Sequence, residues 1–340
     1  MCRQSATLDG PLKAHGRMET MSEQARVWDG VPRLLDGVRI AAEIKAEVGA
    51  EARALKAAGV TPGLAVVLVG HVAASEIYVR SKVKACAELG IYSETHTPPE
   101  SVTTEDLLTL VAELNARDQV DGILVQLPLP AHVDTRRVLE SVLPAKDVDG
   151  FHPVNAGLLQ AGRPGLKPCT PAGVMEILRR SGIRTEGAHS VILGRSDIVG
   201  KPMAMLLLNA HATVTVCHSR TVDIARYTRD ADILVAAIGR AGFVTAEMVK
   251  PGATLIDVGI NRITDAAEVK RFFPSDAKRA KQFEERGSTL VGDIDPAAFA
   301  VSGAYTPVPG GVGALTIAML MHNTVAAAKA RRISDQAAGA

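Results

Sequence analysis

The sequence of 340 residues predicts two α/β domains with parallel sheets, and three observations lead to this fold class. Short apolar runs typical of buried strands alternate with amphipathic segments typical of helices in both halves of the chain. A glycine-bounded loop between an apolar strand and a helix start, at 191–202, indicates a Rossmann-like nucleotide-binding domain in the second half. The long apolar helix at 311–330 must bury its face, and we expect it to pack back on the first domain.

The first half of the chain is predicted to begin with a helix and to continue as alternating strands and helices. Residues 39–59 have an amphipathic pattern that ends at Gly59. Ser75 is expected to cap a helix that ends at Gly90, because serine accepts from a free helical N–H and glycine suits the left-handed turn after a helix. The other elements are buried strands at 64–70 and 121–130, a short strand at 91–97 and a helix at 104–117.

The loop at 191–202 has the features of a phosphate-binding site. Residues 191–193 predict a buried strand, Gly194 and Gly200 bound the loop, and Pro202 suits the first turn of a helix. Free backbone N–H groups and the positive end of the helix dipole would then face the ligand. The alternative is that these glycines only form a tight turn.

The strand predicted at 213–220 indicates which nucleotide is bound. In NAD-binding domains this strand usually ends in Asp or Glu, which binds the ribose 2′-hydroxyl. Here it ends in His218, Ser219 and Arg220, with no carboxylate to repel a 2′-phosphate. Together with Arg195, these residues favour NADP over NAD, although Arg220 alone also fits an ordinary solvated charge.

The remaining elements complete the domain organisation. Strands at 231–239 and 254–260 flank a helix-like segment at 246–252, and a helix at 170–182 bridges the halves. The charged segment 261–287 is expected to form two short helices, and we assign it no chemistry. The predicted parts are a disordered extension at 1–30, a catalytic domain at 31–150 completed by 311–332, a nucleotide-binding domain at 151–310 with an insertion at 262–289, and a flexible tail at 333–340.

Composition argues against several classes of protein. The 38 Lys and Arg residues nearly balance the 37 Asp and Glu residues, so the net charge of +1 favours neither nucleic acid nor an anionic membrane as a partner. No apolar run approaches the roughly 20 residues that span a bilayer. The N-terminus lacks the apolar core of a secretory signal, so we expect a cytoplasmic protein. The 4 cysteines are far apart and the 9 histidines lack ligand spacing, which predicts reduced thiols and no metal.

Four polar residues of the first half are candidates for chemistry. Tyr78 and Lys82 share a face of one predicted helix, which suits proton transfer in a cleft but is also common on helix surfaces. Gln126 lies inside an apolar strand, where a buried amide is either a satisfied core group or a site residue. Asp149 lies in the loop at 144–153, just past a strand end, where α/β folds collect site residues.

The segment at 305–315 is rich in proline and glycine. Proline fixes the backbone and glycine leaves it bare of side chains, which suits the close approach of a flat ligand. A simple lead-in to the last helix is the alternative.

The motifs of the chain, taken in order, resemble one family. From about Leu34 to about Ala330 the sequence is similar to the bifunctional methylenetetrahydrofolate dehydrogenase/cyclohydrolase family, called FolD in bacteria. The matching segments are YVRSKVKACAELGI, DGILVQLPLP, KDVDGFHPVNAGLL, PCTPAGVMEIL, GRSDIVGKPMA, ATVTVCHSRT, DVGIN, VGDID and TPVPGGVGALTIAML.

The resemblance implies two reactions in one cleft. Methylenetetrahydrofolate would give a hydride to NADP, and water would then open the methenyl cation to 10-formyltetrahydrofolate. A place in one-carbon metabolism and purine biosynthesis, and a homodimer, are also implied. A proton-transfer lysine must be partly neutral, and burial or a cationic substrate would favour that form.

The resemblance also implies roles for residues of this chain. Lys82 would be the catalytic lysine of the hydrolytic step, Tyr78 would order the folate beside it, Gln126 would hydrogen-bond the lysine region, and Asp149 would bind the pterin. The implied NADP contacts are Gly194, Arg195, Ser196, Ser219, Arg220 and Ile260. The implied folate wall contains Pro307, Gly310 and Gly311.

Three departures from the family pattern keep other interpretations open. The loop at 70–75 lacks the usual proline and acidic or amide residue, segment 262–289 is longer than usual, and the N-terminal residues are extra. One alternative is a two-domain NADP-dependent dehydrogenase of another small acid, as in shikimate-type enzymes. The other is a catalytically silent folate-binding relative.

Overall fold

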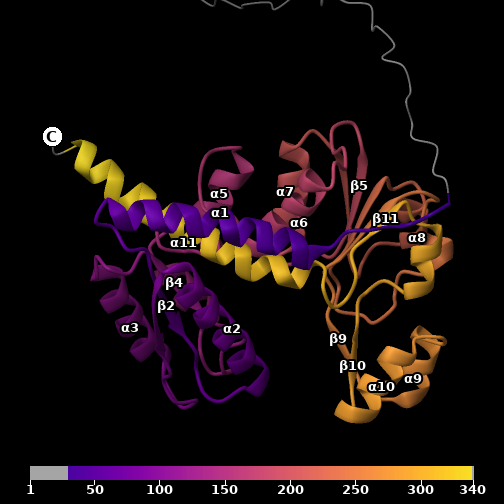
Figure 1. Cartoon of the computed structure of the whole chain (residues 1–340), viewed down its shortest axis with the longest axis horizontal. Helices are drawn as coiled ribbons and strands as arrows, with labels where there is room; N and C mark the ends of the chain where they lie inside the picture. The colour runs from indigo at the N-terminus through magenta and orange to yellow at the C-terminus, as the bar shows by residue number, and fades with distance from the viewer. Residues whose placement is uncertain (1–29, 339–340) are drawn as a thin grey trace, which may run out of the picture.

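The computed structural model describes residues 30–338, and the predicted extension at 1–30 lies outside this range except for its last residue. Two α/β units are joined by a pair of long helices (Figure 1). The predicted fold class of two domains with parallel sheets is confirmed.

The first domain contains a parallel sheet of order β3-β2-β4. Strands β2 and β4 are buried along their whole length, which explains why both are continuous apolar runs. The strands are β2 (Gly63–Val67), β3 (Tyr92–His96) and β4 (Gly122–Val125), and the helices are α2 (Ala73–Leu89), α3 (Thr104–Ala116) and α4 (Thr135–Ser141).

Two predictions for this domain are wrong in detail. Helix α2 begins at Ala73, with Val72 at the N-cap position and no side-chain cap, so Ser75 lies buried within the first turn. Strand β4 ends at Val125, so Gln126 follows the strand instead of lying inside it. The predicted helix end is confirmed, because Gly90 has the left-handed conformation with φ of 71°.

The second domain contains a six-stranded parallel sheet of order β1-β11-β8-β7-β5-β6. Helices cover it in the alternation that the sequence predicts, although the helix-like segment at 246–252 is only a short 3₁₀ turn. The strands are β1 (Arg33–Leu34), β5 (His189–Leu193), β6 (Thr213–Cys217), β7 (Ile233–Ala236), β8 (Thr254–Asp257) and β11 (Ala304–Tyr305). The helices are α5 (Pro153–Gln160), α6 (Cys169–Arg180), α7 (Gly200–Asn209), α8 (Ile224–Thr228), η1 (Ala246–Met248) and η2 (Pro296–Val301).

The chain ends cross between the domains. Strand β1 pairs with β11 in the second sheet, although the sequence predicts that residues 31–150 belong to the first domain. The two strands lead into α1 (Gly37–Ala57) and α11 (Val312–Ala338), which run side by side in the same direction (Figure 1). A Cβ on Gly37 would lie 2.1 Å from the Gly311 carbonyl oxygen, so the starts of the helices require glycine.

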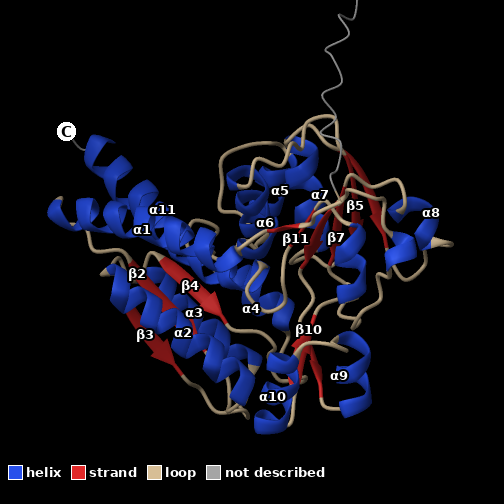
Figure 2. Cartoon of the chain, turned by 45° about the vertical axis from the view of Figure 1, so that its right-hand side comes forward, coloured by secondary structure: helices blue, strands red, loops and turns tan. Residues whose placement is uncertain are grey.

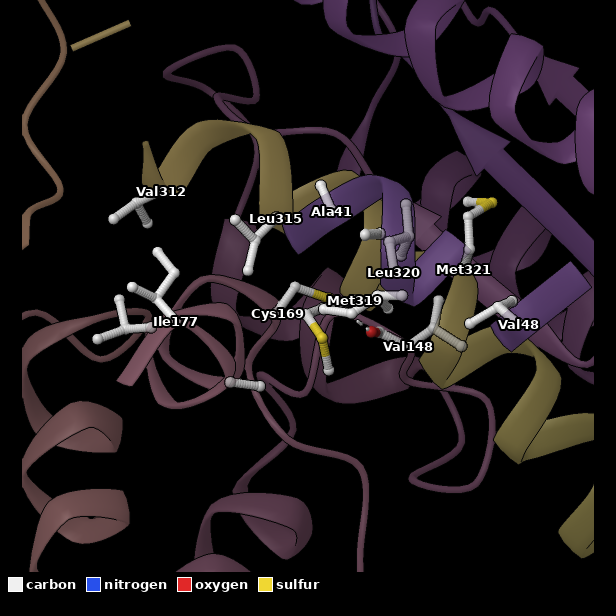
Figure 3. Close-up of a cluster of buried hydrophobic side chains, with 14 of the residues drawn as sticks. Ala41, Val48, Val148, Cys169, Ile177, Val312, Leu315, Met319, Leu320 and Met321 are labelled. Atoms are coloured by element: carbon white, nitrogen blue, oxygen red, sulfur yellow. Dashed lines mark hydrogen bonds between the residues drawn. The ribbon is translucent and has the colours of Figure 1, made fainter. Parts of the chain in front are cut away.

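Helix α11 packs back on the first domain, as predicted. Side chains of α1, α6 and α11 meet in one apolar cluster, in which Leu315 and Met319 are drawn with Ala41 and Ile177 (Figure 3). Helix α11 continues to Ala338 and so includes most of the segment predicted as a flexible tail at 333–340.

Near its end, α11 also forms ion pairs with the first domain. The carboxylate of Asp121, which directly precedes β4, is fully buried. Arg331 and Arg332 donate to it at 2.7 Å each, and the Gly63 N–H donates to it at 3.0 Å.

The insertion at 262–289 extends the second domain on the same side of the α1–α11 pair as the first sheet (Figures 1 and 2). It carries the two short helices that the sequence predicts, α9 (Ala266–Phe272) and α10 (Ala277–Arg286). They are flanked by an antiparallel pair, β9 (Asn261–Ile263) and β10 (Thr289–Val291). Across the described part of the chain, no helix has both the length and the apolarity that crossing a membrane requires.

Candidate active site

Lys82 is held at the centre of the candidate site by Gln126. Helix α2 carries Lys82 with only 8% of its surface exposed. Its Nζ donates to Gln126 Oε1 at 2.9 Å, and Gln126 Nε2 donates to the Leu127 carbonyl at 2.8 Å. The amide orientation is therefore fixed, so that an uncharged acceptor faces the amine. Both interpretations of Gln126 are compatible with this geometry, because its amide is hydrogen-bonded at both ends and one partner is Lys82.

Asp149 lies beside Lys82 in a desolvated position. Burial raises the pKa of Asp149 to about 6, the positive charge of Lys82 opposes this shift and the negative charge of Asp147 adds to it. In the described part of the chain no hydrogen bond reaches the Asp149 carboxylate. It therefore retains its capacity to accept from donors on a ligand.

The neighbours of Asp149 in the 144–153 loop have structural roles. Asp147 accepts from the N–H groups of Gly150 and His152 at 3.1 and 2.8 Å, which fixes the turn around Asp149. Lys146 is buried on the far side of the loop. Its Nζ donates to three carbonyl oxygens at the C-terminal end of α3, those of Leu114, Asn115 and Arg117.

Tyr78 lines a cavity of about 190 Å³ with residues that lie far away in the sequence. Ile260 follows β8, and Pro307, Gly310 and Gly311 belong to the loop before α11. The cavity thus brings together one predicted cofactor contact and all the predicted folate-wall residues. Since Tyr78 is four residues before Lys82, the cavity and the lysine lie along one side of α2.

The wall loop, which we define as Pro307–Gly311, depends on its glycines. Gly310 has φ of 102°, a conformation that other residues rarely adopt. A Cβ on Gly311 would lie 2.5 Å from the Pro307 carbonyl oxygen. The loop is therefore a close-packed backbone surface, as expected for a wall against a flat ligand.

The predicted phosphate loop follows β5 as a tight turn. Gly194 has φ of 116°, and a Cβ there would lie 2.3 Å from the Ala237 carbonyl oxygen. Ser196 Oγ accepts from the N–H groups of Val199 and Gly200 at 3.2 and 3.3 Å, which ties the loop to the start of α7. Arg195 is exposed beside it.

The loop after β6 lies next to the loop after β5. Leu193 and Cys217 are register partners at the ends of these parallel strands, so both loops leave the same edge of the sheet. Ser219 and Arg220 are exposed there. Strand β5 has β6 on one side and β7 on the other, which is the switch point where open α/β sheets bind ligands. Hydroxyl and guanidinium donors at this position fit a phosphorylated ribose.

Two buried aspartates in the second domain connect loops beside the cavity, and the sequence did not predict them as individual residues of the site. Asp257 accepts from the N–H groups of Gly259, Asp293 and Ile294 at 2.9–3.0 Å. Asp293 accepts from Asn261 Nδ2 at 3.0 Å and from three backbone N–H groups, those of Ile238, Gly239 and Arg240. The motifs DVGIN and VGDID contain both residues, but the spacing of the motifs does not show that they meet.

In the described part of the chain, neither the cysteines nor the potential metal ligands form a cluster. Cys86, Cys169 and Cys217 are buried free thiols, and burial raises the pKa of Cys86 to about 12. Among residues 30–338, no group of three or more His, Cys, Asp or Glu side chains is arranged to hold a metal ion.

Comparison with known proteins identifies the two domains. Residues 35–149 match the family described as tetrahydrofolate dehydrogenase/cyclohydrolase, catalytic domain. Residues 168–332 match the NAD(P)-binding domain of the same family. The chain belongs to the tetrahydrofolate dehydrogenase/cyclohydrolase family.

Relatives of this family align over nearly their whole length. The bifunctional protein FolD of Koribacter versatilis is 67% identical over 88% of this chain and 97% of its own. The crystal structure of the bifunctional enzyme FolD of Campylobacter jejuni is similar with a TM-score of 0.81 and 46% identity, over 88% of this chain and 100% of that one. Membership of the family replaces the alternative of a shikimate-type dehydrogenase.

A further structural relative within the family contains a nucleotide. The methylenetetrahydrofolate dehydrogenase-cyclohydrolase of Trypanosoma brucei, complexed with NADP cofactor and inhibitor, is similar with a TM-score of 0.79 and 40% identity. It aligns over 88% of this chain and 98% of its own.

Proposed function

We propose that the chain oxidises 5,10-methylenetetrahydrofolate to 5,10-methenyltetrahydrofolate with NADP⁺ and then hydrolyses the product to 10-formyltetrahydrofolate. The observation that carries this proposal is the hydrogen bond of the buried Lys82 to Gln126, one helical turn from Tyr78. Beside it lies the Asp149 carboxylate, which accepts no hydrogen bond from residues 30–338. Family membership supports the pairing of an oxidation with a hydrolysis.

Asp149 and Tyr78 would bind the folate. A desolvated carboxylate without donors of its own binds N–H groups strongly, and the pterin presents such groups. The negative charge of Asp149 also favours the cationic methenyl substrate. Tyr78 supplies an aromatic face at the cavity that the wall loop encloses.

In the hydrolytic step Lys82 moves a proton at its Nζ. Water forms a bond to the methenyl carbon and passes one proton to the Lys82 amine. The carbon–N5 bond then breaks as the amine returns that proton to N5, and the remaining hydroxyl proton leaves to solvent as the formyl C=O forms. Gln126 Oε1 orients the amine of Lys82 as an uncharged acceptor, and the nearby Asp149 carboxylate supplies the negative charge of the site. This arrangement suits an amine that must both accept and return a proton.

The oxidation depends on placing the nucleotide against the folate. When bound, NADP⁺ accepts a hydride from the methylene carbon. Gly194, Ser196 and the N-terminal end of α7 would hold the pyrophosphate, and Ile260 would contact the nicotinamide side of the cavity. Arg195, Ser219 and Arg220 support NADP over NAD, since the three residues directly after β6 include no carboxylate that would repel a 2′-phosphate.

An absorbance assay tests both activities. Purified protein is given methylenetetrahydrofolate with NADP⁺ or with NAD⁺, and the formation and decay of the methenyl species are followed separately. Reduction of NADP⁺ with fast decay supports both reactions. Turnover with NAD⁺ alone contradicts the proposed preference for NADP. Folate binding without turnover of either nucleotide favours the alternative of a catalytically silent folate-binding relative.

The same resemblance leads us to propose a cytoplasmic homodimer that serves one-carbon metabolism and purine biosynthesis. Analytical ultracentrifugation at micromolar concentration measures the oligomeric state, and a species of only one 35.7 kDa chain would contradict the dimer.

A further inference from the structure

The insertion at 262–289 is a folded unit with a core of its own. Ile263, Val269 and Phe272 are buried with Val291 between the β9–β10 pair and the two helices. A Cβ on Gly242 would lie 2.1 Å from the Phe272 ring, so the insertion packs closely on the loop after β7. This packing fixes α9 on the second domain, and α10 packs against the same cluster through the half-buried Phe283.

Arg279 of α10 points from this unit toward the candidate active site. Its side chain is only 17% exposed, and its guanidinium carbon lies 4.5 Å from the centre of the Phe273 ring. Nη1 donates to the Leu290 carbonyl at 2.6 Å and to Thr289 Oγ1 at 3.3 Å. Nη2 donates to the carbonyl of Val308.

The two carbonyl acceptors belong to residues that line the Tyr78 cavity. Leu290 and Val308 both contribute to its surface, together with Ile260. Prolines at 307 and 309 flank Val308 and lack an N–H. The wall loop therefore has few backbone donors for hydrogen bonds that would stabilise its own conformation. A planar guanidinium that donates to both carbonyls fixes the separation between β10 and the wall loop.

We infer that Arg279 is a positioning residue for the substrate cavity, through which the inserted helices set the shape of the wall loop and hence the affinity for the folate. Arg279 does not touch the substrate in this role; it acts through Val308. The identity of the ligand as a folate rests on the proposed function, whereas the support of the loop by Arg279 does not.

Steady-state kinetics of Arg279→Ala, Arg279→Lys and Arg271→Ala test the inference. Arg271 is the matched control, because it lies in the same insertion and its guanidinium stacks on Phe272 at 4.0 Å without reaching the wall loop. We expect Arg279→Ala to raise KM for methylenetetrahydrofolate about tenfold, since it loses the bonds to two carbonyls, with KM for NADP⁺ within about twofold. Arg279→Lys should recover part of the loss, and Arg271→Ala should match the wild type.

Hydrogen exchange of the peptide at 305–312, measured without ligand, supplies a second measurement. The inference expects faster exchange in Arg279→Ala than in the wild type and in Arg271→Ala. Unchanged exchange together with an unchanged folate KM would overturn it, as would equal changes in both variants. If the wild type itself does not turn over methylenetetrahydrofolate, the proposed function fails, and the exchange rates alone still decide whether Arg279 holds the loop.

Discussion

Two desolvated carboxylate sites in this chain differ in the hydrogen bonds that they accept. In the second domain, Asp257 and Asp293 accept hydrogen bonds from backbone N–H groups and from Asn261. In the first domain, Asp149 accepts none from the described residues, and the nearby charges that act on it are those of Lys82 and Asp147. The saturated pair joins loops of the sheet, while the unsaturated carboxylate is available to a ligand.

The comparison teaches that a raised pKa does not by itself mark a functional carboxylate. Burial raises the pKa of Asp149 to about 6 and that of Asp257 to about 7. What separates the two aspartates is the supply of donors. The experiments below are ordered from the largest expected effect to the smallest.

Replacing Lys82 tests whether the first-domain site is chemical and not only electrostatic. We expect Lys82→Met to lower cyclohydrolase kcat by about 10²–10⁴-fold, because proton transfer at Nζ is lost. Folate binding should remain. Lys84→Met, an exposed lysine on the same helix, is the control. Unchanged hydrolysis in Lys82→Met would remove the catalytic role of this lysine.

Replacing Asp293 tests whether the second-domain pair is structural. Asp293→Ala leaves three backbone N–H groups and the Asn261 amide without their acceptor, so we expect the free energy of unfolding to fall by about 3–5 kcal/mol. Urea unfolding followed by circular dichroism measures the change. Asp295→Ala, which removes only the cap of η2, should cost about 1 kcal/mol. Similar losses in the two variants would contradict the assigned role of the pair.

Replacing Asp149 by asparagine tests the cost of its unsatisfied charge. Because its folded pKa of about 6 lies above the ordinary 3.8, ionised Asp149 destabilises the fold; the effect is absent below about pH 4 and complete above about pH 6. As pH rises from 4 to 7, Asp149→Asn should therefore gain about 2–3 kcal/mol in unfolding free energy relative to the wild type. Folate KM should rise at the same time.

The control for this pH series is Asp118→Asn, an exposed carboxylate of the same domain. This variant removes one negative charge from an exposed position, and so it separates the loss of a charge in general from the loss of the desolvated charge of Asp149. A constant difference between Asp149→Asn and the wild type would show that burial does not penalise the Asp149 charge.

Replacing Arg220 asks whether exposed donors in the second domain also serve a ligand. We expect Arg220→Ala to raise KM for NADP⁺ about tenfold, the value of one charge-assisted hydrogen bond, and to leave KM for NAD⁺ unchanged. Arg226→Ala, exposed on α8, is the control. Equal effects on the two nucleotides would place Arg220 away from the 2′-phosphate.

Most of the fold is predictable because the central strands of its parallel sheets are buried on both faces. The strands at β2, β4 and β7 consist of continuous apolar residues, which the sequence displays directly. Strand β1 has only two residues, both exposed, and carries no such signal. The start of α2 was misplaced because no side chain caps it, so the capping preference of Ser75 pointed to the wrong residue.

The candidate site was predictable where local spacing decides it. The separation of Tyr78 from Lys82 fixes their common helix face, whereas the bond from Lys82 to Gln126 joins residues 44 apart in the sequence. The resemblance to a family supplied that pairing, and spacing alone left it open. The contact of Arg279 with Val308 had no signal of either kind, because it depends on where the insertion packs.

The crossing of the chain ends has a consequence for biosynthesis. Among the described strands, β1 is made before all the others, but its partner β11 is complete only after residue 305 has been made. The buried Asp121 meets Arg331 and Arg332 later still. Neither domain can complete its native contacts before the last helix is synthesised, so a nascent chain that stalls short of this helix leaves both domains unfinished together.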